Sequence, residues 1–169
     1  DTTGIKLCMK YKLDTCKTST GLTNTYQSHK EELDRQLVSL HAFAPKGDYT
    51  VLLFWDIDCG HCKKEVPIIF EKFKELRKEG IDVQVHAVYT QHDYADWLKT
   101  LREMKLIDPD WQNVVDGIHL QNLKEKFDIY STPVIYILNK KGTIKYKRIG
   151  AEQLSDVIHS LEKMKKNGK

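Results

Sequence analysis

Residues 50–67 read TVLLFWDIDCGHCKKEVP. The first six of these residues, which end at Trp55, are almost wholly apolar and have the length of a buried strand. From Cys59 to about residue 78, apolar residues recur at helical spacing, and the pattern stops at Gly80. The sequence therefore predicts a strand, a short acidic loop and a helix, with Cys59 and Cys62 at the start of the helix.

The rest of the chain after residue 67 continues in the same alternating way. We expect, in order, a strand over residues 81–89, an amphipathic helix over 94–105, an irregular segment over 109–117, a short helix over 119–127, a strand over 134–138, a turn over 139–142, a strand over 143–148 and a helix from about 152 to 164. The first strand, helix and strand form a right-handed parallel crossover, and the closing hairpin adds an antiparallel edge. One mixed sheet between helices accommodates both the parallel crossover and the antiparallel hairpin.

The first part of the chain has a different pattern. Apolar and polar residues alternate over residues 5–13, Thr, Ser, Gly and Asn dominate residues 15–25, and residues 28–40 have a helical pattern that opens with a serine cap. We therefore divide the chain into an N-terminal extension of strand, loop and helix over residues 1–47, packed on the fold, and a main domain over residues 48–169.

Composition limits the class of protein. With 40% hydrophobic and 30% charged residues and a net charge of +3, the chain has the character of a soluble globular protein. No apolar run approaches the roughly 20 residues of a membrane helix. The lysines near the end are typical of a solvated helix end, so we expect no nucleic acid partner. Because the chain begins with Asp1, we expect a processed mature form or a fragment, and a membrane anchor could lie in a missing preceding segment.

A Cys-x-x-Cys pair serves either zinc binding or redox chemistry. A structural zinc site needs four ligands, commonly two such pairs or one pair with two closely spaced histidines. Cys8 and Cys16 have the wrong spacing to supply the second pair, and His86 and His92 are too far apart for the histidine pattern. The sequence therefore predicts no metal site.

The redox interpretation fits the position of the pair. At the start of a helix, the Cys59 sulfur faces unpaired backbone N–H groups and the positive end of the helix dipole, which favour the thiolate. We expect its pKa to lie below the free value of about 8.5. Cys62 lies one turn deeper on the same face, where it can attack a mixed disulfide formed at Cys59. The pair would itself be the redox group, without another cofactor.

Two neighbouring side chains are candidates for tuning this pair. His61 could favour the Cys59 thiolate, or it could be an exposed residue without a role. Glu65, one turn beyond Cys62, could relay protons if it is partly buried, or it could face solvent. The sequence alone leaves both alternatives open.

Two motifs together resemble the thioredoxin superfamily. The first is Phe-Trp-x-x-x-Cys-x-x-Cys-Lys-x-Glu-x-Pro over residues 54–67, and the second is Ser131-Thr132-Pro133, some 70 residues later. Within the superfamily, residues 48–165 look most like the periplasmic TlpA/ResA branch of Bacteroidetes-type bacteria. The resemblance implies an α/β thioredoxin fold, in which a central mixed sheet is flanked by helices. It also implies that residues 94–127 form a helical insertion.

The resemblance also implies roles for individual residues. It implies a cis peptide bond between Thr132 and Pro133 beside the cysteines, and it places these two residues at the surface that binds the substrate. Trp55 and Gly60 are assigned to the same surface by resemblance. Glu65 matches the acidic residue that tunes the cysteines in ResA-like proteins.

Three departures from the family pattern concern proton handling and redox direction. Asp58 stands where a Trp usually precedes the first cysteine, and Leu53 stands where thioredoxin has a buried Asp. Proton handling would then fall to Glu65. The dipeptide Gly60-His61 is more similar to that of protein disulfide isomerases, which leaves the direction of electron flow open.

The second cysteine pair has three alternatives. In one straight strand, Cys8 and Cys16 would be roughly 27 Å apart, whereas a disulfide requires Cα atoms within about 7 Å. A structural disulfide therefore needs a turn between them. Unpaired thiols and a second redox pair are the other two interpretations.

The leading hypothesis is a periplasmic or cell-envelope enzyme that exchanges disulfides with proteins and is served by a redox partner protein. A thiol peroxidase is an alternative, although such enzymes place Thr or Ser three residues before the reactive cysteine, where this chain has Asp56. A non-catalytic thioredoxin-fold binding module is the third possibility.

Overall fold

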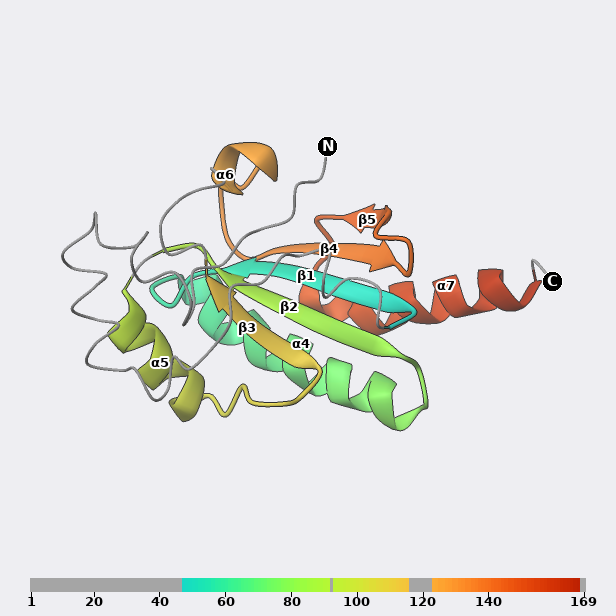
Figure 1. The fold of residues 1–169 in the computed structure, drawn as a ribbon, viewed down its shortest axis with the longest axis horizontal. Helices are drawn as coiled ribbons and strands as arrows, with labels where there is room; N and C mark the ends of the chain where they lie inside the picture. Colours follow the sequence, from blue (N-terminus) through green and yellow to red (C-terminus); the bar gives the residue numbers. More distant parts are fainter. Residues whose placement is uncertain (1–46, 92, 116–122, 168–169) are drawn as a thin grey trace, which may run out of the picture.

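A computed structural model of the chain describes residues 47–91, 93–115 and 123–167 (Figure 1). Its elements, in chain order, are β1 (Tyr49–Trp55), α4 (Gly60–Lys78), β2 (Val83–Tyr89), α5 (Tyr94–Glu103), β3 (Trp111–Val115), α6 (Leu123–Lys126), β4 (Val134–Asn139), β5 (Ile144–Lys147), a 3-10 turn (Ala151–Gln153) and α7 (Leu154–Asn167). The elements expected from the sequence after residue 49 are therefore confirmed, apart from one strand discussed below and the first residues of the short helix over 119–127, which lie outside the described residues.

The five strands form one mixed sheet in the order β3-β2-β1-β4-β5. β1 pairs in parallel with β2, and β2 with β3, whereas β4 is antiparallel to both β1 and β5. In the antiparallel pair Phe54 lies opposite Val134. The carboxyl end of β1 thus meets the amino end of β4, so the loop that carries Cys59 emerges beside Pro133.

Every residue of β1 is buried because the strand is central and both of its faces are covered. Val51, Leu53 and Trp55 belong to the core cluster shared with the buried residues of α4. Leu52 and Phe54 point the other way, into a second cluster with residues of β2, β3 and β4. Because side chains on both faces of the strand are buried, its sequence is a continuous apolar run instead of an alternation of apolar and polar residues.

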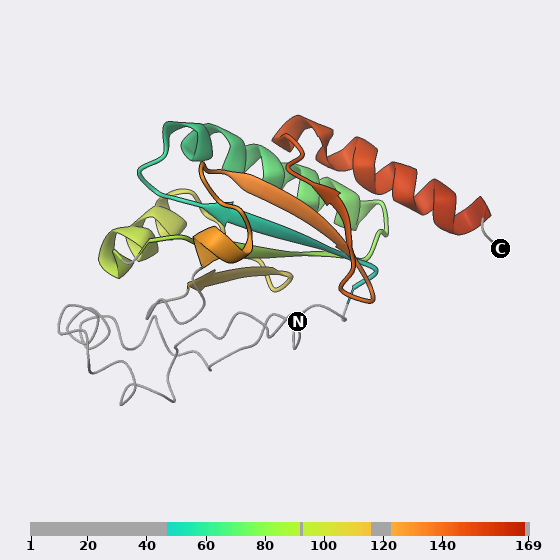
Figure 2. The same ribbon diagram turned by 90° about the horizontal axis from the view of Figure 1, so that it is seen from above.

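The helices bury their apolar faces on the sheet. Figure 2 shows α4 and α7 on the same side of it, and α5 adds Trp97, Leu98 and Leu101 to the same core. On the opposite face, Phe127 follows α6 and packs on Phe54, with ring centroids 5.0 Å apart. Both faces of the sheet therefore carry packed side chains close to the end of β1.

One expectation is wrong. Residues 109–117 were predicted to be irregular, but Trp111–Val115 forms strand β3 and pairs in parallel with β2. The polar Asn113 interrupts the run of apolar residues that is typical of a buried strand. Its side chain can nevertheless be buried, because it donates to the Leu106 carbonyl at 2.7 Å and accepts from Trp111 Nε1 at 3.0 Å. Within its described residues, 94–115 and 123–127, the insertion contains a helix, a strand and a short helix, so it is not purely helical.

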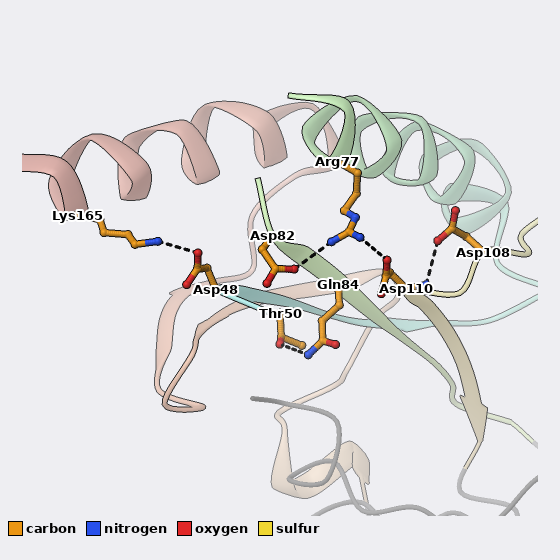
Figure 3. A network of polar contacts seen from close by, with 8 residues as sticks. All are labelled: Asp48, Thr50, Arg77, Asp82, Gln84, Asp108, Asp110 and Lys165. Carbon is orange, nitrogen blue, oxygen red and sulfur yellow. Dashed lines mark hydrogen bonds and ion pairs between the residues drawn. The ribbon is translucent and has the colours of Figure 1, made fainter. Parts of the chain in front are cut away.

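Charged contacts join the elements at the end of the sheet away from the cysteines (Figure 3). Arg77, in the last turn of α4, contacts Asp82 at 3.0 Å just before β2 and Asp110 at 2.6 Å just before β3. Lys165 of α7 contacts Asp48 at 2.7 Å. These ion pairs fix the ends of two helices against the starts of three strands.

Some predictions fall outside the residues that the structure describes. These are the N-terminal extension over residues 1–46, its cysteines Cys8 and Cys16, and the first residues of the short helix expected from residue 119. Among the helices of the described ranges, none has the length and hydrophobicity to cross a membrane.

Candidate active site

The first cysteine of the motif caps helix α4. Cys59 has extended backbone angles, and its Sγ accepts a hydrogen bond from the Cys62 N–H at 3.3 Å. The acidic loop before it is folded on itself: the Asp58 N–H donates to Asp56 Oδ1 at 2.9 Å and the Cys59 N–H to the Asp56 carbonyl at 3.4 Å. The sulfur thus lies where helix N–H groups lack intrahelical partners.

The second cysteine lies beneath the first. Cys62 is fully buried at the start of α4, whereas Cys59 is half-buried. The Cys62 sulfur accepts from the Asp56 N–H at 3.5 Å. Both cysteines are free thiols in the structure. The arrangement gives one sulfur access to solvent and keeps the other inside.

The segment before β4 closes the other side of the site. The Cys59 thiol donates to the carbonyl oxygen of Thr132 at 3.1 Å. The Thr132–Pro133 peptide bond is cis, as the resemblance implies. Two segments more than 70 residues apart therefore meet at one sulfur atom.

The two thiols differ in acidity because their surroundings differ. Burial raises the pKa of Cys59, but hydrogen bonds from the Thr132 side chain and from Cys62 outweigh burial and leave the pKa below its ordinary value. The contact of the thiol with the Thr132 carbonyl acts in the opposite sense, since only the protonated sulfur can donate. For Cys62, burial dominates and raises the pKa to about 12. Cys59 is therefore the sulfur that ionises first.

A family model described as the AhpC/TSA family matches residues 23–147. The chain belongs to this family.

Known relatives agree with the resemblance inferred from the motifs. Sporulation thiol-disulfide oxidoreductase A of Bacillus subtilis is 30% identical over 115 residues, which cover 66% of this chain and 67% of that protein. A domain of a possible thiol-disulfide isomerase from Cytophaga hutchinsonii is 36% identical, with a TM-score of 0.68 over 78% of this chain and 86% of that one. A thiol:disulfide interchange protein from Bacteroides sp. is 26% identical, with a TM-score of 0.59 over 78% and 80%. The thioredoxin fold, the likeness to TlpA/ResA-like proteins and the enzyme class, a thioredoxin-like thiol-disulfide oxidoreductase, are confirmed.

The remaining candidate residues occupy different positions around the cysteines. Gly60 and His61 are exposed on the first turn of α4, and Glu65 is half-buried one turn after Cys62. Trp55 does not reach the surface assigned to substrate: its side chain is fully buried and packs beside Tyr89, with ring centroids 6.4 Å apart. Its apolar run placed it inside the central strand, so it supports the site from below.

Sequence reasoning missed a pair that holds the Thr132 segment. Arg148, at the end of β5, forms an ion pair with Asp128 at 2.7 Å and also donates to the Asp128 carbonyl. Both residues have positive φ values, of 54° for Asp128 and 55° for Arg148. They are 20 residues apart, so no local pattern in the sequence could have linked them.

Side chains able to bind a metal do not gather in the described part of the molecule, where no group of three His, Cys, Asp or Glu residues has a suitable arrangement.

Proposed function

We propose that this chain exchanges disulfides with protein substrates through Cys59 and Cys62, as a reductase or an isomerase. One observation carries the proposal: a half-exposed sulfur with a lowered pKa caps a helix directly above a buried sulfur whose pKa is about 12. A nucleophile and a resolving thiol need this difference in exposure and acidity.

In the first step, the Cys59 thiolate attacks one sulfur of a substrate disulfide. A bond forms between Cys59 Sγ and that sulfur, the substrate S–S bond breaks, and the departing thiolate takes a proton from water. The Cys62 N–H, 3.3 Å from Cys59 Sγ, favours the attacking anion.

In the second step, Cys62 loses its proton and attacks Cys59 Sγ. The mixed disulfide breaks, the substrate leaves as a second thiolate, and two electrons have passed to it from the Cys59–Cys62 dithiol, which is now oxidised to a disulfide. Ionised Cys59 is one of the influences that raise the Cys62 pKa, and this influence disappears once Cys59 is in the mixed disulfide. The Cys62 thiol therefore ionises more readily after Cys59 has formed the mixed disulfide, so its attack follows that of Cys59.

Two further side chains have roles in this proposal. Glu65, half-buried one turn after Cys62, accepts the Cys62 proton directly or through water. His61 stabilises the Cys59 thiolate, and stabilising the reduced form makes the disulfide a better oxidant. Gly60, Thr132 and Pro133 form the surface on which the substrate polypeptide lies.

The proposal extends to compartment and partners. The cysteine pair itself carries the two electrons, so we expect no further cofactor. A dithiol that turns over needs a second redox protein to restore it, and we place the chain in the periplasm or cell envelope, where substrate disulfides persist.

The decisive experiment compares Cys59→Ser and Cys62→Ser in reduction of insulin disulfides. Cys59→Ser should lose activity entirely because its hydroxyl is not a nucleophile near neutral pH. Cys62→Ser should accumulate mixed disulfides with substrate, which are visible as dithiothreitol-sensitive adducts by mass spectrometry. Full activity of Cys59→Ser would overturn the proposal.

Two further measurements separate the alternatives. Rapid peroxide consumption with slow insulin reduction would favour a thiol peroxidase instead. The reduction potential of the Cys59–Cys62 pair then decides direction, since a value near −270 mV is typical of a reductant and one near −120 to −180 mV of an oxidant or isomerase.

A further inference from the structure

Tyr130 has an unusual position for an aromatic side chain. It is 86% exposed, the highest value among the large hydrophobic side chains of the described residues, and the others that are exposed, Ile107, Ile144 and Met164, are not aromatic. An exposed aromatic residue is ordinary by itself. Tyr130, however, stands two residues before Thr132, whose carbonyl oxygen accepts from the Cys59 thiol at 3.1 Å.

The backbone that presents Tyr130 is held on its preceding side. The Ile129 N–H donates to the Lys124 carbonyl at 2.7 Å, and the Ile129 side chain is buried in the cluster that contains Phe54. One residue earlier, Asp128 is held by Arg148. Since its neighbour is anchored inward, the ring of Tyr130 projects from a fixed base, and a ring with two rotatable bonds costs little entropy to order.

Tyr130 is one of the residues that line a cleft of about 550 Å³. Its lining residues come from the ends of β1 and β2, from α6 and from the segment that leads to Pro133: Asp56, Thr90, Gln91, Lys124, Glu125 and residues 129–132. The β2 side is firm because both the N–H and the hydroxyl of Thr90 donate to the Trp55 carbonyl, at 3.0 and 3.2 Å. This volume is within the range of clefts that bind ligand groups.

Two residues that line the cleft, Asp56 and Thr132, also form hydrogen bonds with the two sulfur atoms. The Asp56 N–H donates to Cys62 Sγ at 3.5 Å, and the Thr132 carbonyl accepts from Cys59 Sγ at 3.1 Å. A polypeptide whose disulfide reaches Cys59 therefore carries its neighbouring side chains past this cleft. Of the charged residues that line it, two are acidic and one is basic, so an acidic side chain is the least suited to enter.

We infer that this cleft is a specificity subsite, in which Tyr130 packs against an aromatic or aliphatic side chain next to the reactive cysteine of a substrate polypeptide. The inference rests on the proposed disulfide exchange and adds to it a class of preferred substrate. The chemistry is unchanged: Cys59 still attacks the substrate sulfur, and the subsite acts through the apparent affinity.

The test uses peptides with one internal disulfide that differ only in the residue next to the first cysteine, which is Phe, Leu, Ser or Asp. With the full chain, kcat/KM should be about tenfold higher for the Phe peptide than for the Ser peptide, mainly through KM, and lowest for the Asp peptide. Tyr130→Ala should reduce the Phe-to-Ser ratio to about twofold or less, whereas Tyr130→Phe should keep it. The ratio between peptides cancels any general change in the reactivity of Cys59.

Met164→Ala is the matched control, since Met164 is an exposed apolar residue of α7 with 60% exposure; it should leave the ratio unchanged. Equal rates of the wild type with all four peptides would overturn the subsite, as would a Tyr130→Ala variant that keeps the full preference. Failure of the wild type to reduce any peptide would instead contradict the proposed function, so the two failures are distinguishable.

Discussion

The first turn of α4 is capped by a sulfur atom, whereas its last turn is held by an arginine between two carboxylates. At the first turn, Cys59 Sγ accepts from the Cys62 N–H, and the neighbouring Gly60 and His61 are exposed. At the last turn, Arg77 contacts Asp82 and Asp110. One end thus presents a capping atom that can leave its hydrogen bond and react, and the other fixes the helix against two strands. If this contrast is correct, changes at the first turn alter chemistry and changes at the last turn alter stability.

The largest expected effect is a difference in alkylation between the two cysteines. Burial raises the Cys62 pKa to about 12, whereas hydrogen bonds hold the Cys59 pKa below its ordinary value, so near pH 7 the thiolate of Cys59 is by far the more abundant. The greater nucleophilicity of a more basic thiolate offsets only part of this difference, so Cys59 should be labelled at least about tenfold faster than Cys62. Iodoacetamide labelling followed by peptide mass spectrometry measures the ratio.

The pH dependence of labelling has a definite sign. Because hydrogen bonds lower the Cys59 pKa, the labelling rate of Cys59 should rise with pH around a midpoint lower than that of an ordinary cysteine thiol. Cys62, whose pKa burial raises to about 12, should stay almost unlabelled over the same range. Equal labelling of the two cysteines at pH 7 would contradict the assignment of nucleophile and resolving thiol.

A smaller effect is expected at Glu65, in the second turn of α4. Glu65→Gln removes a proton acceptor but keeps the shape of the side chain, so resolution of the mixed disulfide should slow by about tenfold or more. The slope of the rate with pH should also change, which the loss of a structural contact alone would not cause. Stopped-flow measurement of substrate thiol release tests this, with Glu71→Gln as an exposed control on the same helix. An unchanged pH profile would show that Glu65 takes no part in proton transfer to or from Cys62.

Sequence patterns were sufficient for the elements in which one periodicity dominates. The apolar run of β1 and the helical spacing of α4 gave their positions to within a residue or two, because burial on two faces or on one stripe leaves a strong signal. β3 was missed because it is short and contains a buried Asn113 that is satisfied by local hydrogen bonds. Propensity alone does not reveal such compensation.

In the candidate site, too, some features could be predicted from sequence patterns and others could not. The cysteine pair and Pro133 were found from their motifs, and the antiparallel register of β1 and β4 explains why they meet. The exposure of Tyr130 and the contact of Arg148 with Asp128 depend on how separate segments pack. The burial of Trp55, which the resemblance assigns to the substrate surface, also depends on how separate segments pack. Periodicity along one segment carries no information about such contacts.

At the last turn of α4, Arg77→Ala should lower the free energy of unfolding by about 1–2 kcal/mol, since it removes two partly exposed ion pairs. The rate of insulin reduction should remain that of the wild type. Chemical denaturation monitored by circular dichroism measures the change. Lys99→Ala is the control, because the Lys99–Glu103 pair is more exposed and its atoms are 3.9 Å apart; it should change stability by less than about 0.5 kcal/mol. Loss of activity in Arg77→Ala, without loss of stability, would contradict the view that the last turn of α4 serves stability and the first turn serves chemistry.

The finest test separates the two roles of Cys59, as a cap and as a nucleophile. Serine is a strong N-cap and alanine a poor one, so Cys59→Ala should be less stable than Cys59→Ser by about 1 kcal/mol, although neither variant is active. Thermal unfolding of the two variants under identical conditions measures the difference. A serine variant as stable as the wild type would show that an oxygen caps α4 as well as sulfur does. The sulfur would then be required at this position by its reactivity and not by the helix. Equal stability of the alanine and serine variants would instead mean that the hydrogen bond from the Cys62 N–H contributes little, and that the first turn is held by the packing of Cys62 and Val66 in the core.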